Sequence, residues 1–261
     1  MKKRILCLLL CAALLLPLSA CGRKGGYRVV DTYSGEGDFY IAFRKDDALC
    51  QIISAALKEL AANGTLRTAS LTWFGEDIVG LRGESGAMDE YWDQVEPRTL
   101  IVGVNPNSMP LSYEEGDGFA GFDVDVVNYI CGFLGWSMIL RPIGAEDVDV
   151  QLQSGNIDCA MGVAEGLMNT SYFSYSPSYL EGKYVLVTSL GSSIRSKGGL
   201  RNKVLGVVMS DLDILNSDER FASRLDRVIY QTGTQGLFDA LNAGEVDGIL
   251  VSGAMASYYL R

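Results

Sequence analysis

The chain of 261 residues contains no histidine, the side chain that most often serves as a general base. Without histidine, the Ser-His and Cys-His pairs that activate nucleophiles cannot form, and the commonest ligand of transition metals is missing. No GxxxxGK[ST] loop for nucleotide phosphates occurs either. Carboxylates and lysines are present, but no motif groups them. We therefore expect no enzyme activity, no cofactor and no metal site.

The cysteines add little chemistry to this picture. Three of the six lie within the first 21 residues. The other three, Cys50, Cys131 and Cys159, each sit in an apolar helix or strand pattern. Their odd number and apolar setting favour buried free thiols over one disulfide with a spare cysteine.

The N-terminus has the pattern of an export signal. Three basic residues at positions 2–4 precede an apolar run over residues 5–18, and the string LSAC follows. A positive start, a short apolar core and small residues before a cleavage point are typical of a secretory signal. A run of about 14 residues is too short to span a bilayer. We expect residues 1–20 to be a signal peptide and residues 21–26 a short flexible tether.

The string LSAC resembles the bacterial lipobox, in which the cysteine becomes the first residue of the mature protein and carries lipid. The resemblance implies that Cys21 is acylated, so that a lipid anchor holds the protein at the membrane while its body stays in water. The expected location is extracytoplasmic, anchored to the cell membrane. An ordinary signal peptide with an incidental cysteine is the alternative.

Composition and charge narrow the range of partners. The chain is 48% hydrophobic and 21% charged, as in ordinary globular proteins, and its net charge is −10. Removal of the signal peptide would take away three positive charges and no negative one. A nucleic-acid partner is therefore not expected, because phosphate binding needs a basic face.

The apolar pattern alternates between strands and helices, which predicts an α/β fold. Two segments, LQSGNIDCAM at 152–161 and LNAGEVDGIL at 241–250, are alike. In each, a helix is expected to end on the glycine, and the aspartate is expected to open a short buried strand. Two such copies predict two similar lobes. Strands are expected over 39–44, 100–104, 137–140, 157–163, 184–188, 204–208, 227–230 and 248–251, and helices over 46–62, 123–134, 235–242 and 254–260.

Several strings resemble a known family, the type II periplasmic binding proteins of the polar amino-acid group. LIVGVNPNSMPLSY, GFDVDV and LQSGNID resemble the start of these proteins, and LRNKVLGVVMSD and LFDALNAGEVDGILVSGAMASYYL resemble their second lobe. The resemblance implies a two-lobed α/β fold, each lobe a mixed sheet flanked by helices, with a ligand held in a cleft that closes by hinge motion. It implies a monomer that binds a small polar solute, amino-acid-like or an amine, and delivers it to the permease of an ABC importer.

The order of the segments differs from that of the family. These proteins usually finish with a hinge strand and two helices ending in Trp-Phe-Gly, whereas the matching segment here, residues 27–77, comes first. The chain therefore resembles a circularly permuted member, with a linker at 78–96 that contains a helical turn at 90–95. Surface termini that lie close together tolerate such a change. A fusion of two partial copies is the alternative. We expect lobe 1 over 27–187, with the family's N-terminal segment at 97–187, and lobe 2 over 188–261.

The resemblance also implies binding positions, but key side chains differ. In amino-acid binders, an arginine of the first lobe clamps the carboxylate and an aspartate of the second lobe pairs with the ammonium. These positions fall near Asn169 or Thr170 and at Ser252, and the loop 162–170 has no basic residue. An unpaired desolvated charge costs roughly several kcal/mol. A common amino acid is therefore not expected to bind in the usual way.

The candidate wall residues of the cleft follow from the same placement. They are Tyr40, Asn105, Asn107, Ser108, Tyr113, Glu165, Asn169 and Thr170 on one side, and Met209, Ser210, Asp211 and Ser252 on the other. Each has a structural alternative. Asp211 fits a helix N-cap, Asn105 a turn and Glu165 a solvated loop charge, while Asp123 and Asp125 fit charges that offset a helix dipole. As ligand contacts, Glu165 and Asp211 favour a cationic or polyhydroxy solute.

Two other functions remain open at this point. The missing charge partners are compatible with a ligand-sensing or scaffold lipoprotein whose cleft is degenerate. An enzyme on the same fold, such as a dehydratase or a wall-cleaving lyase, would need a carboxylate with a raised pKa in the cleft, and Glu165 is the candidate.

Overall fold

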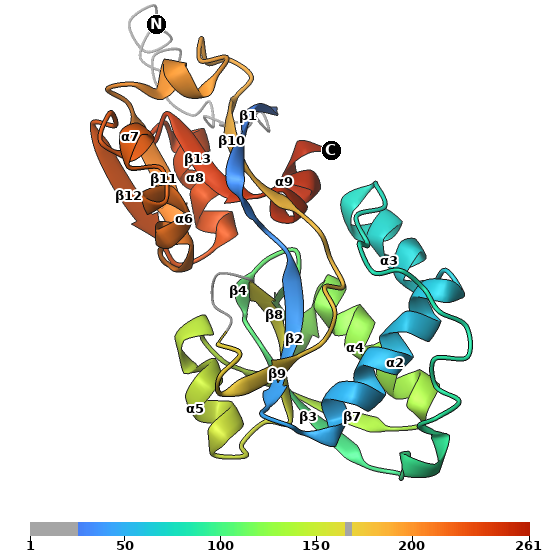
Figure 1. Ribbon diagram of the computed structural model, residues 1–261. Helices are drawn as coiled ribbons and strands as arrows, with labels where there is room; N and C mark the ends of the chain where they lie inside the picture. The colour runs from blue at the N-terminus through green and yellow to red at the C-terminus, as the bar shows by residue number, and fades with distance from the viewer. Residues whose placement is uncertain (1–25, 165–168) are drawn as a thin grey trace, which may run out of the picture.

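The computed structural model describes residues 26–164 and 169–261. These residues form two lobes, each built on a five-stranded mixed sheet (Figure 1). Residues 1–25 and 165–168 lie outside the described part, and with them the expected signal peptide, most of the tether, Cys21 and Glu165. No helix in the described ranges is long and apolar enough to cross a membrane.

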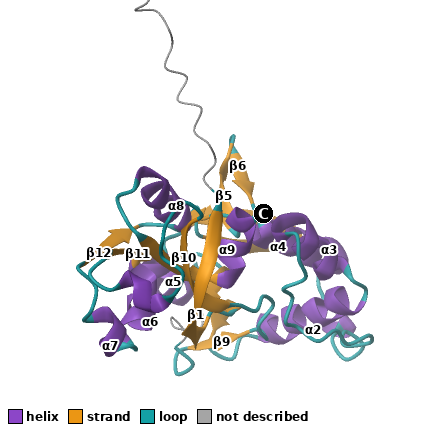
Figure 2. Cartoon of the chain, turned by 90° about the horizontal axis from the view of Figure 1, so that it is seen from above, coloured by secondary structure: helices purple, strands orange, loops and turns teal. Residues whose placement is uncertain are grey.

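The first lobe holds a sheet in the order β7-β3-β8-β2-β9. Strands β7, β3 and β8 are parallel to one another, β2 runs antiparallel to β8, and β9 runs antiparallel to β2. Helices α2, α3 and α4 pack together on one side of the strands (Figure 2), and α5 covers the other face with a smaller apolar cluster. The strands are β2 (Phe39–Arg44), β3 (Thr99–Val104), β7 (Ser137–Pro142), β8 (Cys159–Ala164) and β9 (Phe173–Tyr175). The helices are α2 (Ala48–Ala62), α3 (Thr65–Phe74), α4 (Phe122–Leu134) and α5 (Val148–Gln153), with 3-10 turns η1 (Trp92–Gln94) and η2 (Ala145–Asp147).

The second lobe repeats this arrangement with the order β12-β11-β13-β10-β1. Strands β12, β11 and β13 are parallel to one another, β10 runs antiparallel to β13, and β1 runs antiparallel to β10. Its strands are β1 (Tyr27–Glu36), β10 (Lys183–Ser189), β11 (Val204–Val208), β12 (Arg227–Gln231) and β13 (Gly248–Ser252). Its helices are α6 (Leu212–Asn216), α7 (Glu219–Ala222), α8 (Thr234–Ala243) and α9 (Gly253–Leu260), with η4 (Lys197–Leu200) and η5 (Met209–Asp211). A three-stranded sheet of β4 (Asn107–Ser108), β5 (Ser112–Glu115) and β6 (Gly118–Ala120) is attached to the first lobe.

The two similar segments play the same part in the two sheets. The Asp158 carboxylate accepts a hydrogen bond from the Ile101 amide at 2.8 Å, and the Asp247 carboxylate accepts one from the Val204 amide at 2.9 Å. Each aspartate therefore fixes the start of the neighbouring parallel strand. The glycines ahead of them, Gly155 and Gly244, have positive φ, as expected where a helix ends.

The strand pairing places the boundaries between the two lobes at residues other than those we expected from the sequence. Residues 27–36 and 183–187 were expected in the first lobe. Instead β1 pairs with β10, and β10 pairs with β13, within the second sheet. A strand pattern shows that a segment is extended, but not which sheet completes its hydrogen bonds, so the sequence alone left this open.

Two adjacent backbone segments connect the lobes. The chain passes from β1 to β2 through Gly37 and Asp38, and from the first lobe back to β10 through Gly182. The Gly37 amide donates to the Gly182 carbonyl, and the Gly182 amide donates to the Asp38 carboxylate at 3.1 Å. Figure 1 shows both segments crossing side by side between the lobes. They form the hinge.

The stretch 78–97 contains only the short turn η1, as its mixed pattern predicted. Although most of its residues are exposed, it is attached to the first lobe. The Glu84 amide donates to the Lys58 carbonyl of α2, Lys58 forms an ion pair with Glu84, and Met88 is fully buried. The segment therefore lies along α2 as part of the first lobe.

Two further expectations concern buried groups. Cys50, Cys131 and Cys159 are free thiols, with Cys50 only half-buried. Asp123 lies in the first turn of α4, at the helix start where it was expected, but its side chain is buried inside the first lobe and accepts a hydrogen bond from the Tyr179 hydroxyl at 2.6 Å. Asp125 accepts one from the Trp73 indole at 2.7 Å. These aspartates therefore join helices and loops together instead of facing water.

Candidate ligand-binding cleft

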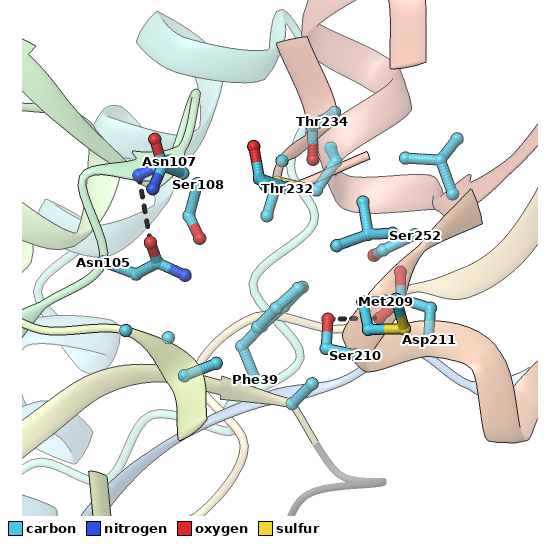
Figure 3. Close-up of a pocket in the computed structure, with 18 of the residues that line it drawn as sticks. Phe39, Asn105, Asn107, Ser108, Met209, Ser210, Asp211, Thr232, Thr234 and Ser252 are labelled. Carbon is cyan, nitrogen blue, oxygen red and sulfur yellow. Dashed lines mark hydrogen bonds between the residues drawn. The ribbon is translucent and has the colours of Figure 1, made fainter. Parts of the chain in front are cut away.

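A cleft of about 670 Å³ lies between the lobes, and both lobes contribute to its walls. Figure 3 shows Asn105, Asn107 and Ser108 on one side and Met209, Ser210, Asp211 and Ser252 on the other. These seven predicted residues converge because each group follows the carboxyl end of a parallel strand, β3, β11 or β13. That edge is where α/β sheets usually place their ligands.

The first wall is held by a tight turn after β3. The Asn107 amide donates to the side-chain oxygen of Asn105 at 3.0 Å, and the Ser112 hydroxyl donates to the Asn105 carbonyl at 2.6 Å. The turn expected from this sequence is therefore present. It does not exclude a role in binding, because the side-chain nitrogen of Asn105 points into the cleft (Figure 3).

The second wall contains one acidic group, Asp211, at the start of α6. It occupies the N-cap position, but its side chain makes no capping hydrogen bond. Instead its carboxylate accepts hydrogen bonds from the Tyr184 hydroxyl at 3.1 Å and from the Ser210 hydroxyl at 3.2 Å. Burial raises the pKa of Asp211 to about 6, and the two hydroxyl donors act in the opposite direction. The carboxylate therefore belongs to the cleft and not to the helix end.

Near the hinge the cleft is more apolar. Phe39, which is 5% exposed, and Met255 line it there together with the buried Ser252. The Ser252 hydroxyl is 3.4 Å from the Gly37 carbonyl. This end of the cleft is thus formed by the hinge segments themselves.

Four of the predicted residues do not line the cleft. Tyr40 lies on β2 beside Phe39, but neighbouring residues of a strand point to opposite faces, and it is Phe39 that faces the cleft. Tyr113 is carried away by β5 and lines a separate hollow with Asn107 and Thr232. Asn169 and Thr170 are exposed and hold structural contacts, to Tyr175 and Lys45 respectively. Glu165 lies outside the described residues.

The sequence reasoning missed several lining residues. Tyr184, Glu146, Thr232 and Thr234 all face the cleft. The two threonines follow the carboxyl end of β12, so the tendency of ligands to bind at the carboxyl ends of parallel strands would have indicated them. Tyr184 gave no such signal, because it stands in a continuous apolar run, residues 184–187, which does not reveal which way its ring faces.

The described residues contain no cluster of carboxylates and cysteines arranged to hold a metal ion. Besides apolar side chains such as Phe39 and Met255, the cleft is lined by hydroxyls, amides and two carboxylates, Glu146 and Asp211. Such a set binds and orients a small polar molecule.

Comparison with known proteins agrees with this geometry. Residues 100–245 match the family model of the bacterial extracellular solute-binding proteins, family 3. The arginine-binding extracellular protein ArtP of Bacillus subtilis is 23% identical over 44% of this chain and 46% of its own length. A probable histidine-binding protein of Campylobacter jejuni is 26% identical over 44% of this chain and 45% of its own. The matched segments thus span less than half of each relative.

Solved structures show the same fold. An ancestral arginine-binding protein bound to arginine superimposes with a TM-score of 0.51 at 26% identity, covering 62% of this chain and 73% of that protein. The family match includes the strands and helices that form most of the cleft wall. The chain therefore belongs to the bacterial extracellular solute-binding proteins, family 3.

Proposed function

We propose that this chain is the substrate-binding lipoprotein of an ABC importer. In this proposal Cys21 carries the lipid anchor, the protein works as a monomer on the outer side of the cell membrane, and the permease in the membrane receives the solute. The ligand is a small polar solute, amino-acid-like or an amine. The relatives named for binding arginine and histidine support a small nitrogen-containing solute.

The observation that carries this proposal is the cleft, with polar groups on both walls, that two hinged lobes share. Its volume of about 670 Å³ suits one small molecule. Its walls come from strand ends of both lobes, so a bound solute would be enclosed when the lobes close. A transport receptor needs such closure, because the permease must distinguish the solute-bound receptor from the empty one.

A thermal-shift screen tests the binding role. A solute that binds the folded state alone stabilises it by mass action, by about 2.7 kcal/mol at a concentration one hundred times its Kd. We expect at least one member of a panel of amino acids, amines, small peptides and sugars to raise the melting temperature by several degrees. A panel without any shift would contradict the transport role and favour a scaffold protein with a degenerate cleft.

The lipid anchor has its own test. Mass analysis of the N-terminal peptide should show an acylated Cys21, and Cys21→Ser should release the protein from the membrane fraction. An unacylated Cys21 in membrane preparations of the wild-type protein would contradict the anchor without affecting the binding role.

We also propose that the chain is circularly permuted relative to the family. The two ends of the described chain meet on one ring of the second lobe, since Phe238 lies 4.8 Å from Tyr27 and 3.9 Å from Tyr259 between ring centroids. A covalent connection at this point would therefore need only a short linker. The packed segment 78–97 would then be the link that replaced the usual ends.

A reordered variant tests this proposal. The variant would begin at Glu96, join Arg261 to Tyr27 through a short glycine-serine linker, and end at Val95. We expect it to unfold cooperatively within a few degrees of the wild-type melting temperature, because every packing contact is retained. A variant that fails to fold when the linker length is varied would argue for a fusion of partial copies instead.

A further inference from the structure

The charged side chains that line the cleft all have the same sign. Its charged side chains, among the described residues, are Glu146 and Asp211, and neither lysine nor arginine lines it. A hollow of about 40 Å³ that shares Asn105 and Gly162 with the cleft has Asp149 as its charged group in the described part. The exposed Arg141 lines a different, neighbouring hollow. Residues 165–168 are Glu, Gly, Leu and Met, so no basic residue is added there.

Asp211 is the best placed of these acids. Its partners are the neutral hydroxyls of Tyr184 and Ser210, and among the described residues no ion pair involves it. Tyr184 is buried and comes from β10, so the carboxylate is held in a fixed position beside the hinge strands. A half-buried carboxylate without a counter-ion is a group that a cationic ligand would complete.

We infer that the ligand is an organic cation without a carboxylate, an amine or a guanidine, and that Asp211 pairs with its positive group. The inference rests on the proposed function and specifies its solute. A zwitterionic amino acid would bring a carboxylate into a cleft whose charged walls are acidic. Its carboxylate would be desolvated and repelled by Asp211 and Glu146. The decarboxylated amine keeps the cation and removes this penalty.

The remaining polar residues suit such a ligand. Asn105, Ser108, Thr232 and Thr234 offer neutral hydrogen bonds on the side of the cleft away from Phe39 (Figure 3). The amide groups at the start of α8 supply only a partial positive charge. The affinity of an amino acid relative to that of its amine shows whether this partial charge can hold a ligand carboxylate.

The test uses pairs of solutes that differ only by a carboxylate. These pairs are arginine and agmatine, lysine and cadaverine, and histidine and histamine. The full chain, purified in detergent and freed of bound solute by unfolding and refolding, would be titrated with each by calorimetry. We expect at least one amine to bind ten-fold or more tightly than its amino acid.

The alternative outcomes separate the two levels of the proposal. An amino acid that binds as tightly as its amine in every binding pair would overturn the inference and leave the transport role intact. Binding of a neutral solute from the wider panel, with no binding of any cation, would do the same. If no solute of any kind binds, both the inference and the transport role fail.

Two variants assign the cation to its partner. Asp211→Asn keeps an acceptor for the Tyr184 and Ser210 hydroxyls but removes the charge, and we expect it to weaken amine binding at least ten-fold and to reduce the preference for amine over amino acid. Asp213→Asn is the matched control. Asp213 is exposed, lies on α6 and does not line the cleft. At physiological salt, the field of an exposed charge is screened over about 8 Å, so Asp213→Asn should change the affinity for the amine less than two-fold. Equal effects of the two variants would overturn the role of Asp211.

Discussion

At the scale of single residues, two buried or half-buried carboxylates have different surroundings. Asp211 opens onto the cleft, whereas Asp123 is enclosed within the first lobe, with 1% of its surface exposed. The Tyr179 hydroxyl donates to Asp123 and in turn accepts from the Gly162 amide at 3.0 Å. Gly162 lines the cleft, so this chain of hydrogen bonds links the core of the first lobe to its wall.

Burial raises the pKa of Asp123 from 3.8 to about 7, while the Tyr179 hydrogen bond lowers it. Between these two pH values the folded state keeps a proton that the unfolded state has lost. The free energy of unfolding should therefore fall as the pH rises from 4 through 7. Asp123→Asn removes this contribution. Urea denaturation at pH 5 and pH 8 gives the loss of unfolding free energy between these pH values, and we expect this loss to be about 2 to 4 kcal/mol smaller in the variant than in the wild type.

The control for this prediction is Asp93→Asn, an exposed site on η1, which should leave the pH dependence as in the wild type. Identical pH dependence in the wild type and in Asp123→Asn would show that Asp123 ionises in the folded state without cost.

At the scale of the element, helix α2 carries much of the core of the first lobe. Seven of its residues are buried, among them Ile53 and Leu57. Its start is fixed by Asp47, whose carboxylate accepts from the Leu49 amide at 3.0 Å and pairs with Arg44 at 2.9 Å. A side chain thus satisfies an amide that the helix itself leaves unpaired.

Asp47→Ala should lower the free energy of unfolding by about 1 kcal/mol, which for a chain of this size lowers the melting temperature by about 2 to 4 °C. Asp47→Asn keeps the capping acceptor and loses only the ion pair with Arg44. We expect its stability to lie close to that of the wild type, because water still reaches this partly exposed ion pair and weakens it. If the two variants were equally unstable, the ion pair would be the stabilising contact.

Comparison of the elements shows what the sequence could and could not predict. Asn105 and Ser252, which were placed by the resemblance to the family, line the cleft because both stand at the ends of parallel strands. Tyr40 was misplaced by one residue, since alternation does not say which face is inward. Tyr113 was misplaced because the small sheet β4-β5-β6 has strands too short to recognise. The position of Asp123 at a helix start was predicted, but its burial was not, because a charged residue type does not indicate a buried site.

At the scale of the whole molecule, the lobes touch on the side of the cleft away from Phe39. A Cβ atom added to Gly233, at the start of α8, would lie 2.2 Å from the Asn107 carbonyl of the first lobe. Gly233 has an extended backbone, with φ of −167°. The constraint on this residue is therefore the approach of the other lobe and not its own conformation.

Gly233→Ala should therefore hold the lobes apart. We expect a larger radius of gyration by solution scattering and an affinity for the solute about ten-fold lower, equivalent to about 1.4 kcal/mol. Gly236→Ala is the control, because its Cβ would meet only the end of the Gln231 side chain, which can rotate away. Unchanged scattering and affinity in Gly233→Ala would show that this contact does not limit closure.

The paired crossing of the hinge has a consequence for the sequence of events in binding. Two short segments that lie side by side, joined by the hydrogen bond between Gly37 and Gly182, favour rotation of one lobe against the other over sliding. Rotation about a fixed axis displaces atoms in proportion to their distance from it. Phe39 and Ser252, near the axis, would keep almost the same separation throughout, while Asn107 and Thr234, on the opposite side in Figure 3, would travel furthest. A solute would therefore first bind at the end of the cleft near the hinge, where Asp211 and Tyr184 also lie. The contacts of Asn107 and Thr234, which lie furthest from the hinge, would then determine the rate at which the solute dissociates.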